Sequence, residues 1–182
     1  MRGWILATAP FFGIGTRTIV YMTRIEYRST DIRGLELIRP LWLQLNEHHR
    51  ALARKFRTHY EQMTFDDRKN YFEHVAKTGS LRLDLAWDPG AGRFVGYCVS
   101  SLSEDKTAEI ESVFLEKDYR SEGIGSALME RALGWMNAQG AVRKRVSVGD
   151  GNEETWKFYE KFGFYPRLTV LEQKNEHVHP DK

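Results

Sequence analysis

The spacing of apolar residues predicts that the folded part of the chain opens with a strand and an amphipathic helix. Polar and apolar residues alternate over Arg24–Arg28, as in a half-buried strand. The polar run 29–31 then offers an N-cap to a helix that reaches about Glu47. Its apolar residues recur every three or four positions and share one face: Ile32, Leu35, Ile38, Leu41, Trp42 and Leu45. We expect Pro40 to kink this helix, because proline lacks a backbone donor.

The rest of the chain continues the alternation of helical and extended patterns. Helical spacing or period-two alternation, bounded by Gly, Pro and polar turn residues, predicts each further element. In chain order these are helices at 49–62 and 64–77, strands at 81–87, 93–102 and 108–115, a helix at 126–139, a strand at 142–148, a helix at 152–162 and a strand at 165–172. Such an order predicts one domain of the α/β (α+β) class.

Composition narrows the class of protein. With 182 residues, 41% of them hydrophobic and 29% charged, the chain is typical of a globular domain with a sizeable core. The net charge is only +2, so neither a nucleic acid nor a membrane surface is indicated as a partner. The basic groups at 143–145 and 50–55 are interpreted as solvated faces. Cys98, the only cysteine, lies in an apolar stretch and is predicted to be a buried, unreactive thiol.

A glycine-bearing turn joins the strand at 108–115 to the helix at 126–139. It reads Arg120-Ser121-Glu122-Gly123-Ile124-Gly125-Ser126. The two glycines allow a ligand close to the backbone, and the unpaired N–H groups of a helix start favour a phosphate or pyrophosphate, helped by the charge of Arg120. Neither a complete G-x-G-x-x-G nor a P-loop Gly-Lys-Ser/Thr is present. Taken alone, the turn also fits an ordinary helix start.

A second motif makes the first one specific. It runs Asn152-Glu153-Glu154-Thr155-Trp156-Lys157-Phe158-Tyr159 and continues to Phe164. The two motifs, in this order, resemble the GNAT N-acetyltransferase superfamily over residues 22 to about 172. The resemblance implies a mixed, mostly antiparallel sheet with helices on both faces and splayed fourth and fifth strands. It also implies acetyl-CoA as co-substrate, with its pyrophosphate on residues 120–126.

The resemblance further assigns roles to single residues. The pantetheine arm is expected to pair with the backbone of Val113, Phe114 and Leu115, and Asn152 to contact it or to cap the helix. Tyr159 is expected to bind the cofactor and to protonate the departing thiolate. Glu111 is a candidate base that takes the proton of the acceptor amine through water, with recognition of an ammonium and a plain solvated residue as alternatives. Thr155 stands where the family pattern has alanine.

The histidines are not spaced as metal ligands, and we predict no metal. His48 or His49 reaches the acceptor pocket in this interpretation. The others have no assigned role: His59, His74, His177 and His179.

The hypothesis is therefore direct transfer of acetyl from acetyl-CoA to the primary amine of a small molecule or peptide in a ternary complex. Cys98 is badly placed to carry an acyl group. The enzyme is expected in the cytoplasm, without nucleic-acid or membrane partners, and a homodimer stays open. The alternative is a non-catalytic acyl-CoA-binding or sensing module, which would need neither Glu111 nor Tyr159. A nucleic-acid-binding domain is the third and weakest candidate.

The ends of the chain are expected to lie outside the domain at 22–172. Residues 1–21 faintly resemble a signal peptide, but their apolar stretch is too short for a membrane span. We interpret them as a dispensable extension, and 173–182 as a polar tail.

Overall fold

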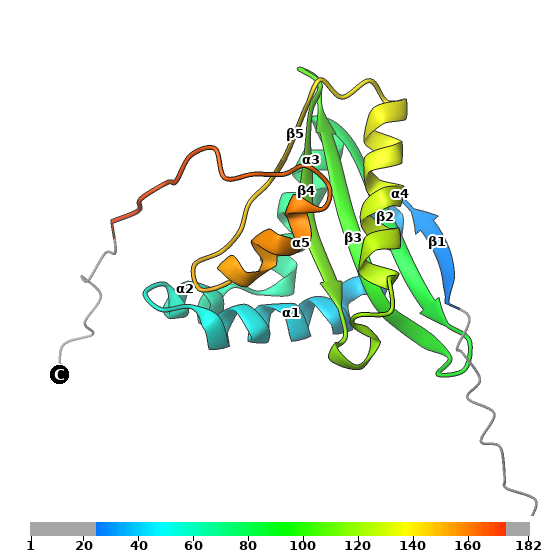
Figure 1. The fold of residues 1–182 in the computed structure, drawn as a ribbon, viewed down its shortest axis with the longest axis horizontal. Coiled ribbons are helices and arrows are strands. Elements are labelled where there is room, and N and C mark those ends of the chain that lie inside the picture. Colours follow the sequence, from blue (N-terminus) through cyan, green and yellow to red (C-terminus); the bar gives the residue numbers. More distant parts are fainter. Residues whose placement is uncertain (1–24, 174–182) are drawn as a thin grey trace, which may run out of the picture.

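The protein contains a twisted five-stranded sheet, described for residues 25–173 by a computed structural model (Figure 1). The strand order is β1-β2-β3-β4-β5, with antiparallel pairs throughout except for the parallel pair of β4 and β5. The mixed, mostly antiparallel sheet is therefore confirmed. The strands are β1 (Glu26–Thr30), β2 (Gly79–Asp88), β3 (Arg93–Ser103), β4 (Thr107–Leu115) and β5 (Arg143–Val146).

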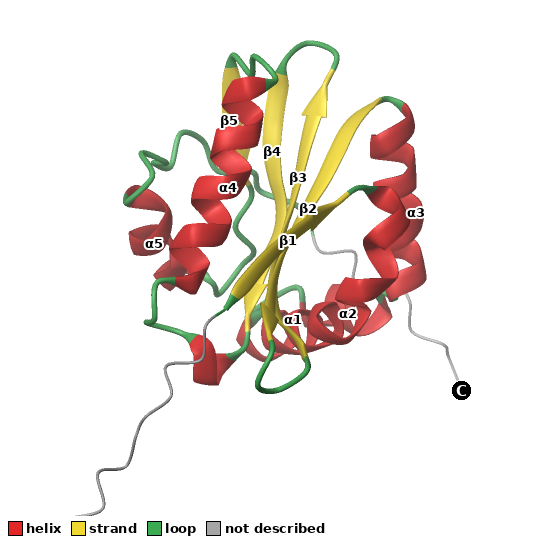
Figure 2. Ribbon diagram, turned by 90° about the vertical axis from the view of Figure 1, so that its right-hand side faces the viewer, coloured by secondary structure: helices red, strands yellow, loops and turns green. Residues whose placement is uncertain are grey.

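Helices cover both faces of this sheet (Figure 2). One side carries the 3-10 helix η1 (Ile32–Ile38) with α1 (Arg39–Leu52), α2 (Arg57–Gln62) and α3 (Phe65–Lys77), and the other side carries α4 (Ile124–Ala138) and α5 (Trp156–Glu160). Short 3-10 turns, η2 (Lys117–Tyr119) and η3 (Glu153–Thr155), precede α4 and α5.

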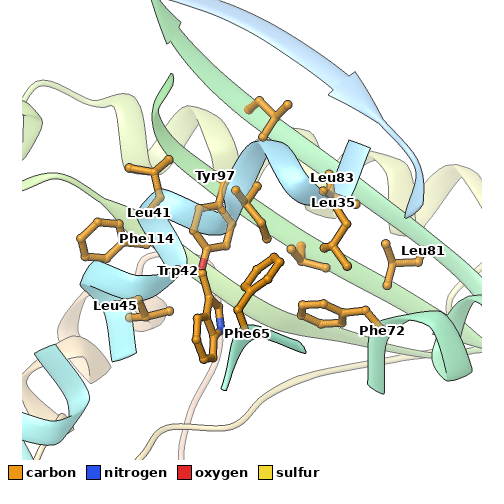
Figure 3. Close-up of a cluster of buried hydrophobic side chains, with 13 residues drawn as sticks. Leu35, Leu41, Trp42, Leu45, Phe65, Phe72, Leu81, Leu83, Tyr97 and Phe114 are labelled. Atoms are coloured by element: carbon orange, nitrogen blue, oxygen red, sulfur yellow. The ribbon is translucent and has the colours of Figure 1, made fainter. Parts of the chain in front are cut away.

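Two apolar cores follow from the alternation of side chains along the strands. On β3, Tyr97 and Val99 belong to the core under α1 and α3, whereas Cys98 between them belongs to the core under α4. Figure 3 shows the first core, where Trp42 meets the ring of Phe65 edge-on at 5.5 Å between centroids. Cys98 is fully buried, as predicted, and burial raises its thiol pKa to about 12.

The helix starts follow local chemistry, with one correction at Pro40. The Asp31 side chain accepts from the Arg33 backbone N–H and caps η1, and Thr64 forms a reciprocal capping box with Asp67 at the start of α3. The predicted kink at Pro40 is wrong. The 3-10 helix ends at Ile38 and Pro40 lies in the first turn of α1, where its missing N–H has no partner to lose.

Three further boundaries differ from the sequence-based expectation. The helix expected at 49–62 is only α2, because α1 continues to Leu52, and the helix expected at 152–162 is shortened to η3 and α5. The strand expected at 165–172 is absent, and Tyr165, Leu168, Val170 and Leu171 are 71–91% exposed. Strand propensity needs a sheet edge to pair with, and this segment runs away from β5 (Figure 1).

The extension 1–21, the tail beyond residue 173, and His177 and His179 lie outside the described residues. Among residues 25–173, no helix is long and apolar enough to span a membrane.

Candidate active site

The candidate site begins where β4 and β5 part. The two strands pair only from Thr107 with Arg143 to Ile110 with Val146, while β4 continues to Leu115. The predicted splay is therefore present. Glu116 N–H bonds to Val95 O on β3, so the register turns the backbone groups of Phe114 towards β3 as well. The alternate residues, Val113 and Leu115, then direct their N–H and C=O groups into the gap.

A cleft of about 910 Å³ occupies this gap and passes on to α1 and α2. Most of the predicted site residues line it: Glu111, Val113, Phe114, Leu115, Arg120, Ser121, Gly123, Gly125, Ser126, Asn152 and Tyr159. Two predicted cofactor-binding residues do not line it. Glu122 is exposed, and the Ile124 side chain is buried in the core under α4, so neither side chain faces a ligand there.

The turn before α4 has the geometry of an anion site. Gly123 is the N-cap of α4 with φ of +82°, and Ser121 also has a positive φ of 67°. No side chain caps the helix, so the first N–H groups of α4 are left for a ligand. The turn is anchored to the end of β2, because Tyr119 Oη donates to the buried Asp88 carboxylate at 2.6 Å.

Tyr159 and Asn152 come from the segment that follows β5, and they line the cleft on that side. Tyr159 on α5 is 9% exposed, and its ring packs edge-on against Phe158 and Phe164. Its hydroxyl has no hydrogen bond, while every buried side-chain polar atom among the described residues has a partner, so the hydroxyl opens onto the cleft. Burial raises the Tyr159 pKa, which keeps the phenol protonated at neutral pH. The Asn152 side chain makes no capping bond, which leaves its amide for a ligand.

Glu111 is held by a β-bulge in β4. Val99 of β3 faces Ser112 and Ser100 faces Ile110, so Glu111 is the extra residue of β4 at this point. Its carboxylate accepts from Ser101 Oγ at 2.7 Å and from Tyr71 Oη at 3.0 Å. The side chain is 6% exposed, which rules out the alternative of a plain solvated residue.

The far end of the cleft has a largely uncharged wall from α1 and α2. It is formed by Trp42, Asn46, His48, His49, His59, Tyr60 and Met63. His49 stacks on Tyr60 with 5.3 Å between ring centroids. Burial, followed by the charges of His48 and Arg68, lowers the pKa of His49 to about 4, so this histidine is neutral at pH 7.

The wall is fastened to the segment after β5. Arg54 bonds to Asp150 through its backbone N–H at 2.9 Å and through its guanidinium at 2.7 Å, and it also pairs with Glu153. A Cβ on Gly149 would lie 2.5 Å from the Tyr60 hydroxyl, so any larger residue there would have to displace the Tyr60 side chain. These contacts therefore join the end of α1 to the segment after β5.

Comparison with known proteins identifies the family. The profile of the acetyltransferase (GNAT) family matches residues 42–164, which is most of the chain. The chain belongs to this GNAT family. A mycothiol acetyltransferase of Beutenbergia cavernae is 31% identical over 135 residues, which cover 73% of this chain and 43% of that protein. The matches to the curated relatives compared span between 32% and 47% of the relatives' lengths.

Solved structures show the same fold. The PaiA N-acetyltransferase of Thermoplasma acidophilum, in complex with coenzyme A, is 20% identical with a TM-score of 0.63 and covers 81% of this chain and 93% of its own. An aminoglycoside N-acetyltransferase in complex with CoA is 16% identical with a TM-score of 0.62, over 87% of this chain and 99% of its own. At these sequence identities, the two solved structures show only that this chain shares their fold.

Several residues that line the cleft belong to no sequence motif that would have predicted their place there. Arg68, Tyr60 and Gly149 reach the cleft only because α2, α3 and the segment after β5 converge on it. The sequence predicts that His48 or His49 reaches the acceptor pocket, and both residues line the cleft. Among residues 25–173 there is no cluster of His, Cys, Asp or Glu that could hold a metal ion.

Proposed function

We propose that this GNAT chain transfers the acetyl group of acetyl-CoA to the primary amine of a small molecule or peptide, in a ternary complex in the cytoplasm. One observation carries the proposal. A single cleft connects the anion-binding turn at 120–126, the unpaired edge of β4, and the side chains of Glu111 and Tyr159. These are the parts that a thioester donor and an amine acceptor both need within one cavity.

The cofactor would follow the cleft from the turn to the bulge. Its pyrophosphate accepts hydrogen bonds from the N–H groups at the start of α4, beside Arg120. The pantetheine amides pair with the free backbone of Val113 and Leu115 as an added strand would, although Leu115 O already accepts from Arg120 Nε at 3.1 Å. The solved neighbours with bound CoA support this choice of cofactor.

In the reaction, the amine nitrogen attacks the thioester carbonyl and the carbon–sulfur bond breaks. The Glu111 carboxylate retains accepting capacity beside its bonds to Ser101 and Tyr71, and it takes the amine proton through water. Tyr159 gives its proton to the thiolate. With its raised pKa the phenol is a weak acid, so its contribution depends on position against the sulfur.

The acceptor reaches the reaction centre from the side of α1 and α2. The related mycothiol acetyltransferase and the structurally similar aminoglycoside N-acetyltransferase, by their names, modify small molecules, and they support a small-molecule amine here. A non-catalytic acyl-CoA-binding module would use the turn at 120–126 equally well. It gives no reason for a phenol that opens onto the cleft without a partner.

Kinetics and binding together test the proposal. Tyr159→Phe should lower kcat for CoA release at least about a hundredfold and leave the Kd for acetyl-CoA nearly unchanged, because only the proton donor is removed. Tyr165→Phe, an exposed phenol outside the cleft, is the matched control and should behave as the unaltered protein. Binding of acetyl-CoA without turnover over a broad amine panel would support the sensing module instead.

A further inference from the structure

The acceptor end of the cleft offers one negative and one positive group. Glu111 is the only carboxylate among the described residues that line the cleft, and Arg68 faces it at 3.7 Å between nitrogen and oxygen. His49, with its pKa near 4, adds no charge, and burial also lowers the pKa of His48. A polycationic acceptor would therefore find no second carboxylate here, and would meet the Arg68 cation instead.

Arg68 has donors to spare. One guanidinium nitrogen donates to Glu111 O at 2.6 Å, which is the only hydrogen bond of this side chain among the described residues. A guanidinium carries five N–H groups. Since no buried side-chain polar atom within residues 25–173 lacks a partner, the remaining donor nitrogens are accessible, and Arg68 lines the large cleft.

The position of the guanidinium is fixed by its surroundings. Its carbon lies 4.4 Å from the ring centroid of Phe72 and 4.8 Å from that of Tyr71, and the side chain is 23% exposed. A planar, partly desolvated guanidinium with free donors is the group that proteins use to bind a carboxylate.

We propose that the acceptor is amino-acid-like: a monoamine that carries its own carboxylate, with the amine at Glu111 and the carboxylate on Arg68. This inference rests on the acetyl transfer proposed above. The adjacent opposite charges of the protein complement the adjacent charges of an α-amino acid. The uncharged body of the acceptor lies against the wall that contains His49, Tyr60 and Met63.

The test compares matched acceptors in the full chain with acetyl-CoA, by release of CoA. The acceptors are phenylalanine, leucine, the carboxamide of each, and spermidine as a polycation. The unaltered protein should favour the free amino acids over spermidine by at least about tenfold in kcat/KM. Arg68→Gln should lower kcat/KM for the amino acids about tenfold to a hundredfold, mainly through KM, and change the value for the carboxamides less than about threefold.

Two further variants separate recognition from folding. Lys69→Gln removes the next cation of α3, whose ammonium bonds to Glu36 at 2.7 Å. This variant should change kcat/KM neither for the amino acids nor for their carboxamides. Arg68→Lys keeps the charge and should recover part of the preference for a carboxylate. Comparing variants also cancels the difference in basicity between an amino acid and its carboxamide.

The outcomes are distinct. If Arg68→Gln lowers turnover of amino acids and carboxamides equally, Arg68 only anchors the bulge carbonyl and the inference is overturned. Turnover of spermidine alone would overturn it too, but would leave acetyl transfer to an amine standing. No turnover with any acceptor, despite binding of acetyl-CoA, would remove the proposed function and this inference with it.

Discussion

Alanine at three glycines of the turn and helix α4 should give three different results, because each glycine serves a different purpose. Gly123 has a φ of +82°, where an L side chain is strained although nothing lies within 4 Å of its Cβ. Gly125 is helical, and its Cβ would touch the Phe158 ring at 3.6 Å, an ordinary contact. Gly134 is helical and exposed, with nothing within 4 Å.

The magnitudes follow from these settings. Gly123→Ala should destabilise the fold by about 1–2 kcal/mol, the cost of a left-handed conformation for a residue with a Cβ. Gly134→Ala should stabilise it by about 1 kcal/mol, the difference in helix propensity. Gly125→Ala, in the first turn, should stabilise it by about 0.5 kcal/mol. For a chain of this size, each 1 kcal/mol shifts Tm by about 2–4 °C.

Binding should not follow stability. Gly123→Ala and Gly125→Ala should both raise the Kd for acetyl-CoA, about tenfold, because a methyl group displaces a phosphate from the backbone donors. Gly134→Ala, which lies beyond the cleft, should leave the Kd unchanged.

Thermal unfolding by circular dichroism gives the Tm of each variant, and calorimetry gives its Kd. Glutamate at 123 or 125 is a stronger form of the same test, because it adds negative charge and should weaken binding well over tenfold. If Gly123→Ala raises Tm as much as Gly134→Ala does, the left-handed turn is refuted. If folded variants at 123 and 125 keep the unaltered Kd, the phosphate site is refuted.

Three further predictions concern buried groups. The pKa of His49, near 4, lies below its ordinary value, so the contribution of this residue to stability is present above about pH 6.5 and is lost as the pH falls through 4. The free energy of unfolding in urea should therefore depend less on pH for His49→Gln than for the unaltered protein. Parallel curves for the two proteins would contradict this. Cys98 should resist a thiol reagent at pH 8 in the native protein and react once unfolded, whereas rapid native labelling would place the thiol at the surface. Asp84→Ala should destabilise the fold by about 3 kcal/mol or more in urea, because Asp84 is fully buried against Arg82 and Arg131; a loss below about 1 kcal/mol would contradict the argument.

The sequence by itself determined those features that depend on neighbouring residues. Glycine at 123 permits the positive φ that the turn before α4 requires, and the Thr64–Asp67 capping box needs only its own four residues. The turn at 120–126 and the motif at 152–159 could therefore be recognised from the sequence, as could the two strands that became β2 and β3. The resemblance carried by these two motifs then implied the mixed sheet and the splay of its fourth and fifth strands.

The tertiary structure alone decided what depends on distant segments. The stretch 165–172 has strand-forming residues, but it pairs with no strand, since a strand forms only against an available edge. The bulge that presents Glu111 exists only in the register of β3 against β4. Arg68 and Tyr60 come to the cleft because α2 and α3 pack over the sheet, and no local pattern encodes the cavity that they share. Local chemistry thus determined the turn at 120–126, whereas packing between elements determined the opposite end of the cleft, under α1 and α2.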